Sequence, residues 1–430
     1  MGKQELIEAY QKLSVLEPLQ SSDDKLLRDL YKDFLERIIT ILILNKEKHY
    51  KLLLSGHTGC GKSTFLNILS DNSDIKEKFF VVPYSIKDVL DPDDIDHIDL
   101  ILSMALQAVI RAHESHIKIS TNLKERVRKI RDSLQEVMIE EQETIRRKKK
   151  EIGGGAGLGA IMKWLKLDFF ASYQLNKEVR DSVRKRYKAE IRDLIDTTNT
   201  ILSEIQSKLR EKRILFLVDD TDKPPLRNAF EIFDDNGLHL ARLNANIAFV
   251  IDMSVACSSR YRIITSKIGQ GEPFPSIKIA ERDGSDSGYC KNNRDRLKAL
   301  LGKRISNGLI EGKALGEAVE SSGGIVREAV RILKLAAEQC IVSDGKKIQE
   351  TDVDSAVLKI RNEYSLNMKH VDLLKKVLDN PKWIPEQDED IESADSPFLV
   401  LLHNLALMEY LNDERWRRPN PVLIKWLERM

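Results

Sequence analysis

A glycine-rich run between two apolar segments constrains the fold of this chain more than any other feature. Tyr50–Leu54 has the character of a short buried strand, and the run Gly56–Thr64 (GHTGCGKST) follows almost at once. It fits the pattern G-x-x-x-x-G-K-[ST], and apolar residues at helical spacing come after it. The sequence therefore predicts a strand, a tight turn and a helix in immediate succession.

The chemistry of this turn predicts a site for phosphate groups. Glycines let the backbone bend so that successive N–H groups point inward, and the helix N-terminus adds partial positive charge. We expect Lys62 to reach the β- and γ-phosphates, Ser63 to coordinate Mg²⁺, and Thr64 to pack behind. The predicted nucleotide-binding residues are Gly56, His57, Thr58, Gly59, Cys60, Gly61, Lys62, Ser63 and Thr64.

An acidic strand end is the expected counterpart of this turn. Ile214–Val218 is apolar throughout and runs into Asp219 and Asp220. We expect Asp219, with Ser63, to hold Mg²⁺, and Asp220 to orient or deprotonate the attacking water, with Lys62 assisting catalysis. The plainer interpretation is a strand that merely stops at an acidic turn. Asp222 is expected to cap the turn that follows.

The nucleotide is expected to be ATP. A GTPase would present an N-K-x-D element after a strand, whereas Asn45-Lys46 is followed by Glu47-Lys48, and Asn176-Lys177 by Glu178-Val179. Neither run fits the guanine-reading pattern.

The composition of the chain argues against several other classes of protein. Lys and Arg total 69 against 68 Asp and Glu, so overall charge favours neither nucleic acid nor a membrane surface. The four cysteines form no CxxC pair, which argues against a disulfide framework or a zinc site. No run reaches the roughly 18 apolar residues of a membrane-spanning helix. We expect a cytoplasmic protein.

Further short apolar strands alternate with helical segments, which predicts an α/β fold with a parallel sheet between helices. We expect an ATPase core over residues 1–283 with a helical insertion at about 120–212, an α-helical lid over 284–364, and a small winged-helix-like module over 365–430. The expected elements are strands at Lys78–Val82, Arg213–Val218, Asn246–Ile251 and Ser276–Ile279, and helices at Ser21–Asn45 (capped by Ser22) and Ile95–Ala112.

The insertion is expected to form two long helical arms joined at a flexible tip, Gly153–Gly159. The basic run Arg146–Lys150 is interpreted as a solvated helix face. The amphipathic segment that follows the tip contains Trp164, Leu165 and Phe169. Packing of these side chains against the arms or the core is favoured over contact with a membrane or a partner.

In the last third, Thr351–Asp354 resembles an S/T-x-x-[DE] helix start. The apolar stretch Pro397–Leu411 is expected to be one helix whose core Trp416 and Trp426 help to close. The terminal module is interpreted as contacting protein rather than DNA, because its basic cluster at Arg415–Arg418 is short.

Three motifs together resemble AAA+/STAND-type P-loop ATPases: GHTGCGKST, ILFLVDDTDK (Ile214–Lys223) and GGIVREAVRIL (Gly323–Leu333). The chain is similar to poorly characterised bacterial ATPases that carry a helical insertion before the Walker B strand. The resemblance implies that Arg327 is a lid arginine contacting the γ-phosphate. It also implies a polar sensor, Asp252 or Ser254, and an arginine finger for which Arg260 and Arg262 are the unresolved candidates.

These features favour an ATP-driven conformational switch that moves the lid, arms and terminal module toward a protein partner or a second copy. The resemblance suggests a role in bacterial signalling or defence against mobile elements. Asp220, where Glu is commoner, indicates slow hydrolysis. Two alternatives stay open: a nucleic-acid-acting loader or motor, and a scaffold that binds nucleotide without hydrolysing it.

Overall fold

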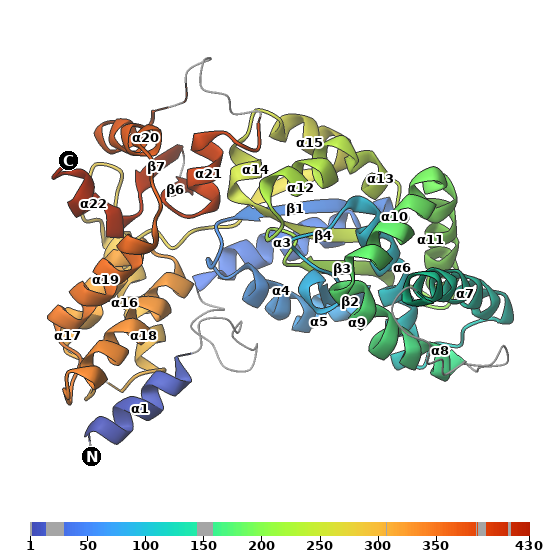
Figure 1. Cartoon of the computed structure of the whole chain (residues 1–430), viewed down its shortest axis with the longest axis horizontal. Helices are drawn as coiled ribbons and strands as arrows, with labels where there is room; N and C mark the ends of the chain where they lie inside the picture. Colours follow the sequence, from blue (N-terminus) through green and yellow to red (C-terminus); the bar gives the residue numbers. More distant parts are fainter. Residues whose placement is uncertain are drawn as a thin grey trace.

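A parallel sheet forms the centre of the computed structural model, which describes residues 2–13, 30–143, 158–306, 308–383, 385, 393–411 and 414–430 (Figure 1). Its five strands run in the order β2-β3-β4-β1-β5. They are β1 (Lys51–Gly56), β2 (Phe79–Ser85), β3 (Arg213–Asp219), β4 (Asn246–Asp252) and β5 (Gln270–Pro273). Because the strands are parallel, Gly56 pairs with Asp252 and Ser85 pairs with Asp219, so the candidate site residues share one sheet edge.

The central strands are almost wholly buried, which explains their continuous apolar sequences. Every residue of β1 and β4 is buried, as are Ile214–Val218 of β3. Helices flank this sheet, as the alternation of apolar strands and helical segments predicts. They are α3 (Lys32–Leu44), α4 (Lys62–Asp71), α5 (Ser73–Lys78), α6 (His97–Glu114), α12 (Leu226–Phe230), α13 (Gly237–Ala241), α14 (Met253–Cys257) and α15 (Tyr261–Ile268), with short turns η1 (Lys46–Lys48), η2 (Ile86–Asp88) and η4 (Glu231–Asp235).

The strand predicted at Ser276–Ile279 is wrong: the fifth strand is β5, a few residues earlier. Which of the two segments becomes the strand depends on how closely its backbone can approach its neighbours, and not on how apolar its side chains are. A Cβ at Gly269 would lie 2.2 Å from the Lys51 carbonyl oxygen, and one at Gly271 would lie 1.8 Å from Tyr261 Oη. Glycine therefore lets this polar edge segment lie beside β1, while Ile277 and Ile279 are buried in irregular backbone.

The insertion contains more helices than the two arms predicted, and it lies at one end of the molecule (Figure 1). Asn176 divides its second half, because its side chain accepts a hydrogen bond from the Val179 N–H and so starts a new helix. Trp164, Leu165 and Phe169 are buried, in agreement with the packing interpretation. The predicted basic run Arg146–Lys150 and the first five residues of the predicted tip Gly153–Gly159 lie outside the described residues, and the last two residues of the tip begin the helix α8. The segments are α7 (Thr121–Glu143), α8 (Leu158–Trp164), η3 (Leu165–Phe169), α9 (Phe170–Leu175), α10 (Lys177–Ala189) and α11 (Ile191–Gln206).

The last third of the chain lies at the opposite end (Figure 1). Four helices precede a smaller group of two helices, a two-stranded antiparallel hairpin and a final helix. Within these described residues the order is α16 (Gly288–Gly302), α17 (Gly312–Ser321), α18 (Val326–Val342), α19 (Glu350–Glu363), α20 (Met368–Asp379), α21 (Pro397–His403), β6 (Leu407–Leu411), β7 (Arg415–Pro419) and α22 (Pro421–Leu427).

Two local predictions in this region are wrong. The helix expected over Pro397–Leu411 ends at His403, because the Asn404 side chain accepts from the Ala406 N–H and Leu405 takes a left-handed φ of 62°. The following residues form β6. The helix start expected at Thr351 lies earlier: α19 begins at Glu350, and Asp352 accepts a hydrogen bond from the Gln349 N–H (2.9 Å).

The first helix, α1 (Gly2–Lys12), packs against α18 rather than against the sheet (Figure 1). Leu6 and Ala9 of this helix and Leu13 just after it are buried, and Lys334 Nζ lies 5.1 Å from the Tyr10 ring centroid. The helix start predicted at Ser22 lies outside the described residues, and α3 forms the later part of the helix predicted over Ser21–Asn45. No helix in the described ranges combines the length and apolar character needed to cross a bilayer.

Candidate functional site

The turn between β1 and α4 is shaped by glycines that no other residue could replace without strain. Gly59 has φ 84° and Gly61 has φ 109°, both in the left-handed region. A Cβ at Gly59 would lie 2.7 Å from Arg327 Cβ, and one at Gly61 would lie 3.0 Å from Tyr31 Oη. The glycines thus permit the bend and also admit two neighbouring side chains.

Lys62 is buried at the start of α4 and is held from several sides. Its Nζ donates to the carbonyl oxygens of Gly56 and His57, both at 2.6 Å, and lies 2.9 Å from Asp222 Oδ2. Burial alone would lower the Lys62 pKa, but the Asp222 charge raises it above its ordinary value. Burial likewise would raise the Asp222 pKa, while Lys62 and Lys223 bring it below its usual range. Both groups are therefore charged.

The predicted role of Asp222 as a turn cap is wrong. The turn that follows runs through Pro224 and Pro225, which have no N–H to donate, and the Asp222 carboxylate is engaged by the ammonium groups of Lys62 and Lys223. The Asp222 carboxylate faces Lys62 instead. Asp222 lies three residues after the end of β3, outside the pair of acids expected at the strand end. Its pairing with Lys62 becomes visible only in the folded turn.

Ser63 and Asp219 come together at the carboxyl edge of the sheet. The Ser63 side chain lies beside the Asp219 carboxylate and acts to lower its pKa. Asp219 Oδ1 is buried and has no hydrogen-bond partner among the described residues. Burial, and then the neighbouring Asp220 charge, raise the Asp219 pKa to about 6. A buried carboxylate oxygen without a donor requires an explanation.

These two side chains fit Mg²⁺. This hard cation takes oxygen ligands, keeps several waters, and uses one or two protein carboxylates together with substrate phosphates. No group of three or more His, Cys, Asp or Glu side chains in the described ranges is arranged to hold a metal, which argues against an all-protein metal cage there. One hydroxyl and one carboxylate with a free oxygen are the donor set that a magnesium–nucleotide site requires.

Asp220 is held in an unusual backbone conformation, with φ 62°. The Ser85 hydroxyl donates to its Oδ2 at 2.5 Å, and Lys87 Nζ lies 3.2 Å from the same oxygen. A non-glycine residue in the left-handed region carries strain that the surroundings must maintain. Ser85 and Lys87 were absent from the sequence-based site, because the register that places β2 beside β3 is not readable from either strand alone.

Arg327 lies directly on the glycine turn. Its backbone N–H donates to the Gly59 carbonyl oxygen at 3.2 Å, and its side chain is partly exposed. The two candidate sensor residues bond to each other, since Asp252 accepts from both the backbone and the hydroxyl of Ser254. Arg260 is engaged by Asp234 and Asp235 of its own chain, whereas Arg262 is exposed.

The hairpin β6–β7 also reaches the glycine turn, a contact that the sequence does not predict. The Glu409 N–H donates to His57 Nε2 at 2.7 Å, and burial lowers the His57 pKa to about 4, so this imidazole is neutral. His403 Nδ1 lies 3.4 Å from Asp252 Oδ2. The Tyr410 hydroxyl donates to the Gly323 carbonyl oxygen (2.8 Å) just before α18.

Tyr31 also contacts the glycine turn. Its hydroxyl donates to the Cys60 carbonyl oxygen at 2.6 Å, and burial raises its pKa well above the ordinary value. Its ring lies 4.8 Å from that of Phe274. Tyr31 therefore anchors the start of α3 to the turn, and it is another residue that the sequence analysis missed.

Residues 31–234 match the family model described as KAP family P-loop domain, a range that contains both the glycine turn and the acidic strand end. No curated protein matches the chain. The match confirms the predicted P-loop NTPase domain and does not identify a STAND subtype.

Several solved structures are similar over most of their length. The ORC2 protein of Aeropyrum pernix in its ADP form shares 12% identity, with 97% of this chain and 96% of that chain covered and a TM-score of 0.42. Cdc6p from Pyrobaculum aerophilum shares 14% identity over 97% and 98%, with a TM-score of 0.39. The RuvB Holliday junction branch migration motor of Thermotoga maritima shares 11% identity over 89% and 91%, with a TM-score of 0.35.

Proposed function

We propose that this chain is an AAA+/STAND-like switch that binds and slowly hydrolyses ATP with Mg²⁺. The observation that carries the proposal is the meeting of Ser63 and Asp219 beside the buried P-loop lysine, with one carboxylate oxygen left without a donor. This unpaired oxygen can accept a ligand from outside the chain.

Each group has a distinct task in this proposal. The amides of the glycine turn and the ammonium of Lys62 bind phosphate oxygens, and Ser63 and Asp219 hold Mg²⁺. The metal, when bound, neutralises charge on the phosphates as the terminal phosphoryl group is transferred. Asp220 orients the attacking water, and Arg327 brings a fixed positive charge from the lid.

The contacts around the glycine turn favour a switch over a simple hydrolase. The terminal hairpin contacts His57, while α18 begins at the turn with Arg327. A nucleotide bound in this turn therefore lies next to both the proposed lid, which contains α18, and the terminal module, which contains the hairpin. ATP shifts their positions only if it binds two arrangements with different affinity, which is the physical requirement of any such switch.

A protein partner, or a second copy of the chain, is favoured over DNA. The basic cluster of the terminal module is largely engaged within the chain: Arg417 donates to Glu409 at 2.9 Å, and Arg415 lies 3.3 Å from the same carboxylate. Arginines that are paired internally contribute less to phosphate binding. A setting in bacterial signalling or defence is the role suggested by the sequence resemblance.

The test combines binding with turnover. Calorimetry with Mg-ATP should show binding that disappears in Lys62→Ala, and phosphate release by the wild type should be lost in Asp220→Asn. Binding with equal, negligible release in both proteins would identify a scaffold and end the hydrolysis proposal. Hydrolysis that DNA stimulates, with a steep loss at higher salt, would identify a nucleic-acid-acting ATPase instead.

A further inference from the structure

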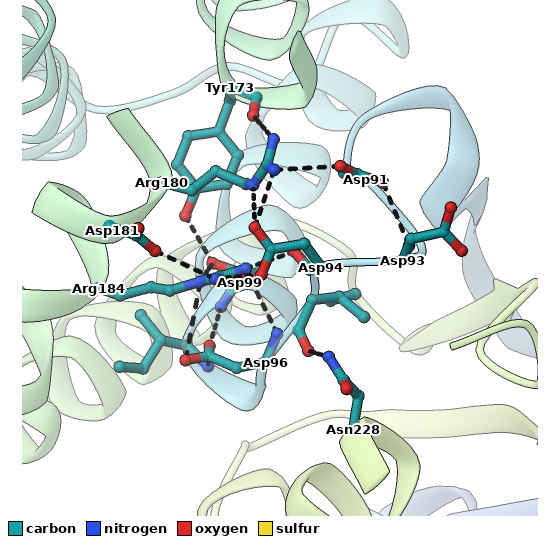
Figure 2. A network of polar contacts seen from close by, with 12 residues as sticks. Asp91, Asp93, Asp94, Asp96, Asp99, Tyr173, Arg180, Asp181, Arg184 and Asn228 are labelled. Carbon is teal, nitrogen blue, oxygen red and sulfur yellow. Dashed lines mark hydrogen bonds and ion pairs between the residues drawn. The ribbon is translucent and has the colours of Figure 1, made fainter. Parts of the chain in front are cut away.

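The insertion is joined to the core by a partly buried network of arginines and aspartates (Figure 2). Arg180 of α10 donates to Asp94 (3.0 and 2.8 Å) and to Asp91 (3.0 Å), and Arg184 pairs with Asp94 (2.8 Å) and Asp99 (2.6 Å). The Arg180 side chain is 5% exposed. Asp91 and Asp94 belong to the segment between β2 and α6, and Asp99 belongs to the first turn of α6, so the arginines fix this part of the core to the insertion.

The same network continues toward the catalytic carboxylate. Arg180 Nη1 donates to the carbonyl oxygen of Gln174 at 2.8 Å, and Gln174 Nε2 donates to the carbonyl oxygen of Lys87 at 2.6 Å. Lys87 Nζ then lies 3.2 Å from Asp220 Oδ2. A continuous series of polar contacts thus leads from α10 to Asp220.

We propose that Lys87 is a positioning residue that restrains Asp220, and that the insertion sets this restraint through Gln174 and Arg180. The inference rests on the proposed function, in which Asp220 orients the attacking water. Asp220 Oδ2 already accepts from Ser85 and faces the Lys87 ammonium, so this oxygen has little capacity left for a water proton. Hydrolysis is slow while both partners are in place.

Lys87 is the adjustable partner of the two. Ser85 is part of β2 and is paired in register with Asp219, which fixes its hydroxyl to the sheet. Lys87 lies on the short turn η2 (Ile86–Asp88), and its side chain is 48% exposed. The insertion holds the backbone of this turn at the Lys87 carbonyl. A movement of α9 and α10 would therefore displace the ammonium while leaving the serine in place.

Steady-state ATP hydrolysis by variants of the full chain tests the proposal. Lys87→Met should raise kcat about fivefold with little change in KM, because a partly exposed ion pair is worth a modest factor. Lys87→Arg should retain the wild-type rate. Lys185→Met is the matched control, since Lys185 is an exposed lysine on α10 and should leave the rate unchanged.

A second pair of variants tests the role of the insertion. Gln174→Ala should raise kcat about twofold, and the double variant with Lys87→Met should be no faster than Lys87→Met alone, because both changes release the same contact. Adding Asp220→Asn to Lys87→Met should abolish the gain.

The outcomes separate this inference from the function beneath it. Measurable wild-type turnover that is lost in Asp220→Asn but unchanged or lower in Lys87→Met would overturn the restraint and leave the ATPase proposal standing. Additive effects of Gln174→Ala and Lys87→Met would overturn the link to the insertion. Turnover that is absent from every variant, or insensitive to Asp220→Asn, would overturn the proposed function together with the inference.

Discussion

Two acidic clusters near the carboxyl edge of the sheet use similar residues in different ways. One, around Asp219, Asp220 and Asp222, faces the P-loop; the other, around Asp94 and Asp99, faces the insertion. Burial first, and then a neighbouring aspartate, raise the pKa of both Asp219 and Asp99 to about 6. A raised pKa therefore does not distinguish a binding site from a structural joint in this protein.

Hydrogen bonding distinguishes the two clusters. Both oxygens of Asp99 have donors: Tyr173 bonds to Oδ1 (2.5 Å), and Arg184 bonds to Oδ2 (2.6 Å). Asp219 Oδ1 has none among the described residues. A satisfied buried charge fixes two segments together, whereas an unsatisfied one is poised for an outside partner. The unpartnered oxygen is thus what separates Asp219 from Asp99 in this comparison.

The largest expected effect is on nucleotide binding. Lys62→Ala should weaken Mg-ATP about a thousandfold, measured by calorimetry, because it removes a charged donor to the phosphates. The variant also leaves Asp222 buried without its partner. Lys62→Ala with Asp222→Asn removes both charges, and recovery of binding in that double variant would contradict the role given to Lys62.

Removing a cation from the structural cluster should affect folding and not binding. Arg184→Met leaves Asp99 buried with an uncompensated charge, and should cost about 3 to 5 kcal/mol of unfolding free energy. Thermal unfolding measures this loss, and Mg-ATP affinity of the folded protein should stay as in the wild type. Arg192→Met, an exposed arginine on α11, is the control. A loss of affinity without a loss of stability would erase the distinction between the clusters.

Neutralising one carboxylate in each cluster should give stability changes of opposite sign. Asp219→Asn should raise the free energy of unfolding of the metal-free protein by about 1 kcal/mol, since an unpaired buried charge is costly. It should also weaken the enhancement of ATP binding by Mg²⁺ about tenfold. Asp99→Asn should lower stability, because Arg184 loses a charged partner. Unfolding curves without metal, run side by side, would reveal a common sign if the comparison is wrong.

Asp252 is an intermediate case, and its contact with His403 predicts the smallest effect. The neighbouring Asp252 carboxylate raises the pKa of His403, against burial, and Asp222 and Lys223 act on it in opposite senses. A raised histidine pKa stabilises the fold fully below about 6.5 and loses that effect as pH rises through the folded value.

The measurement is the melting temperature from pH 6 to pH 9 for wild type and His403→Gln. The stability advantage of the wild type, roughly 1 kcal/mol or less, should shrink as pH rises. The neutral His57 is present in both proteins and does not contribute to the difference. An advantage that grows with pH would exclude a charged His403.

The sequence predicts the core well because local pattern and tertiary role agree there. Long apolar runs such as Asn246–Ile251 can only be central strands, and the P-loop motif carries its own turn chemistry. The prediction of secondary structure fails where contacts with other parts of the chain or a single backbone conformation determine it. Gln270–Pro273 is a strand because two glycines allow close approach to Lys51 and Tyr261, and Leu407–Leu411 is a strand because a left-handed Leu405 ends the preceding helix.

The same reasoning explains which site residues were found. Lys62, Ser63, Asp219 and Asp220 belong to two contiguous motifs, so their proximity follows from the parallel sheet. Three further residues reach the site only in the folded chain: Asp222 contacts Lys62, Lys87 contacts Asp220, and Tyr31 contacts Cys60. In each pair the two residues belong to different segments of the sequence. No periodicity in a single sequence encodes such pairings.

The position of α1 has a consequence for synthesis of the protein. This helix, with buried Leu6 and Ala9, leaves the ribosome well before the helix on which it packs, α18, which is translated some three hundred residues later. Contacts between such distant segments form late and slowly. The nascent chain therefore carries an uncovered amphipathic helix while the sheet forms, and docking of that helix closes the fold.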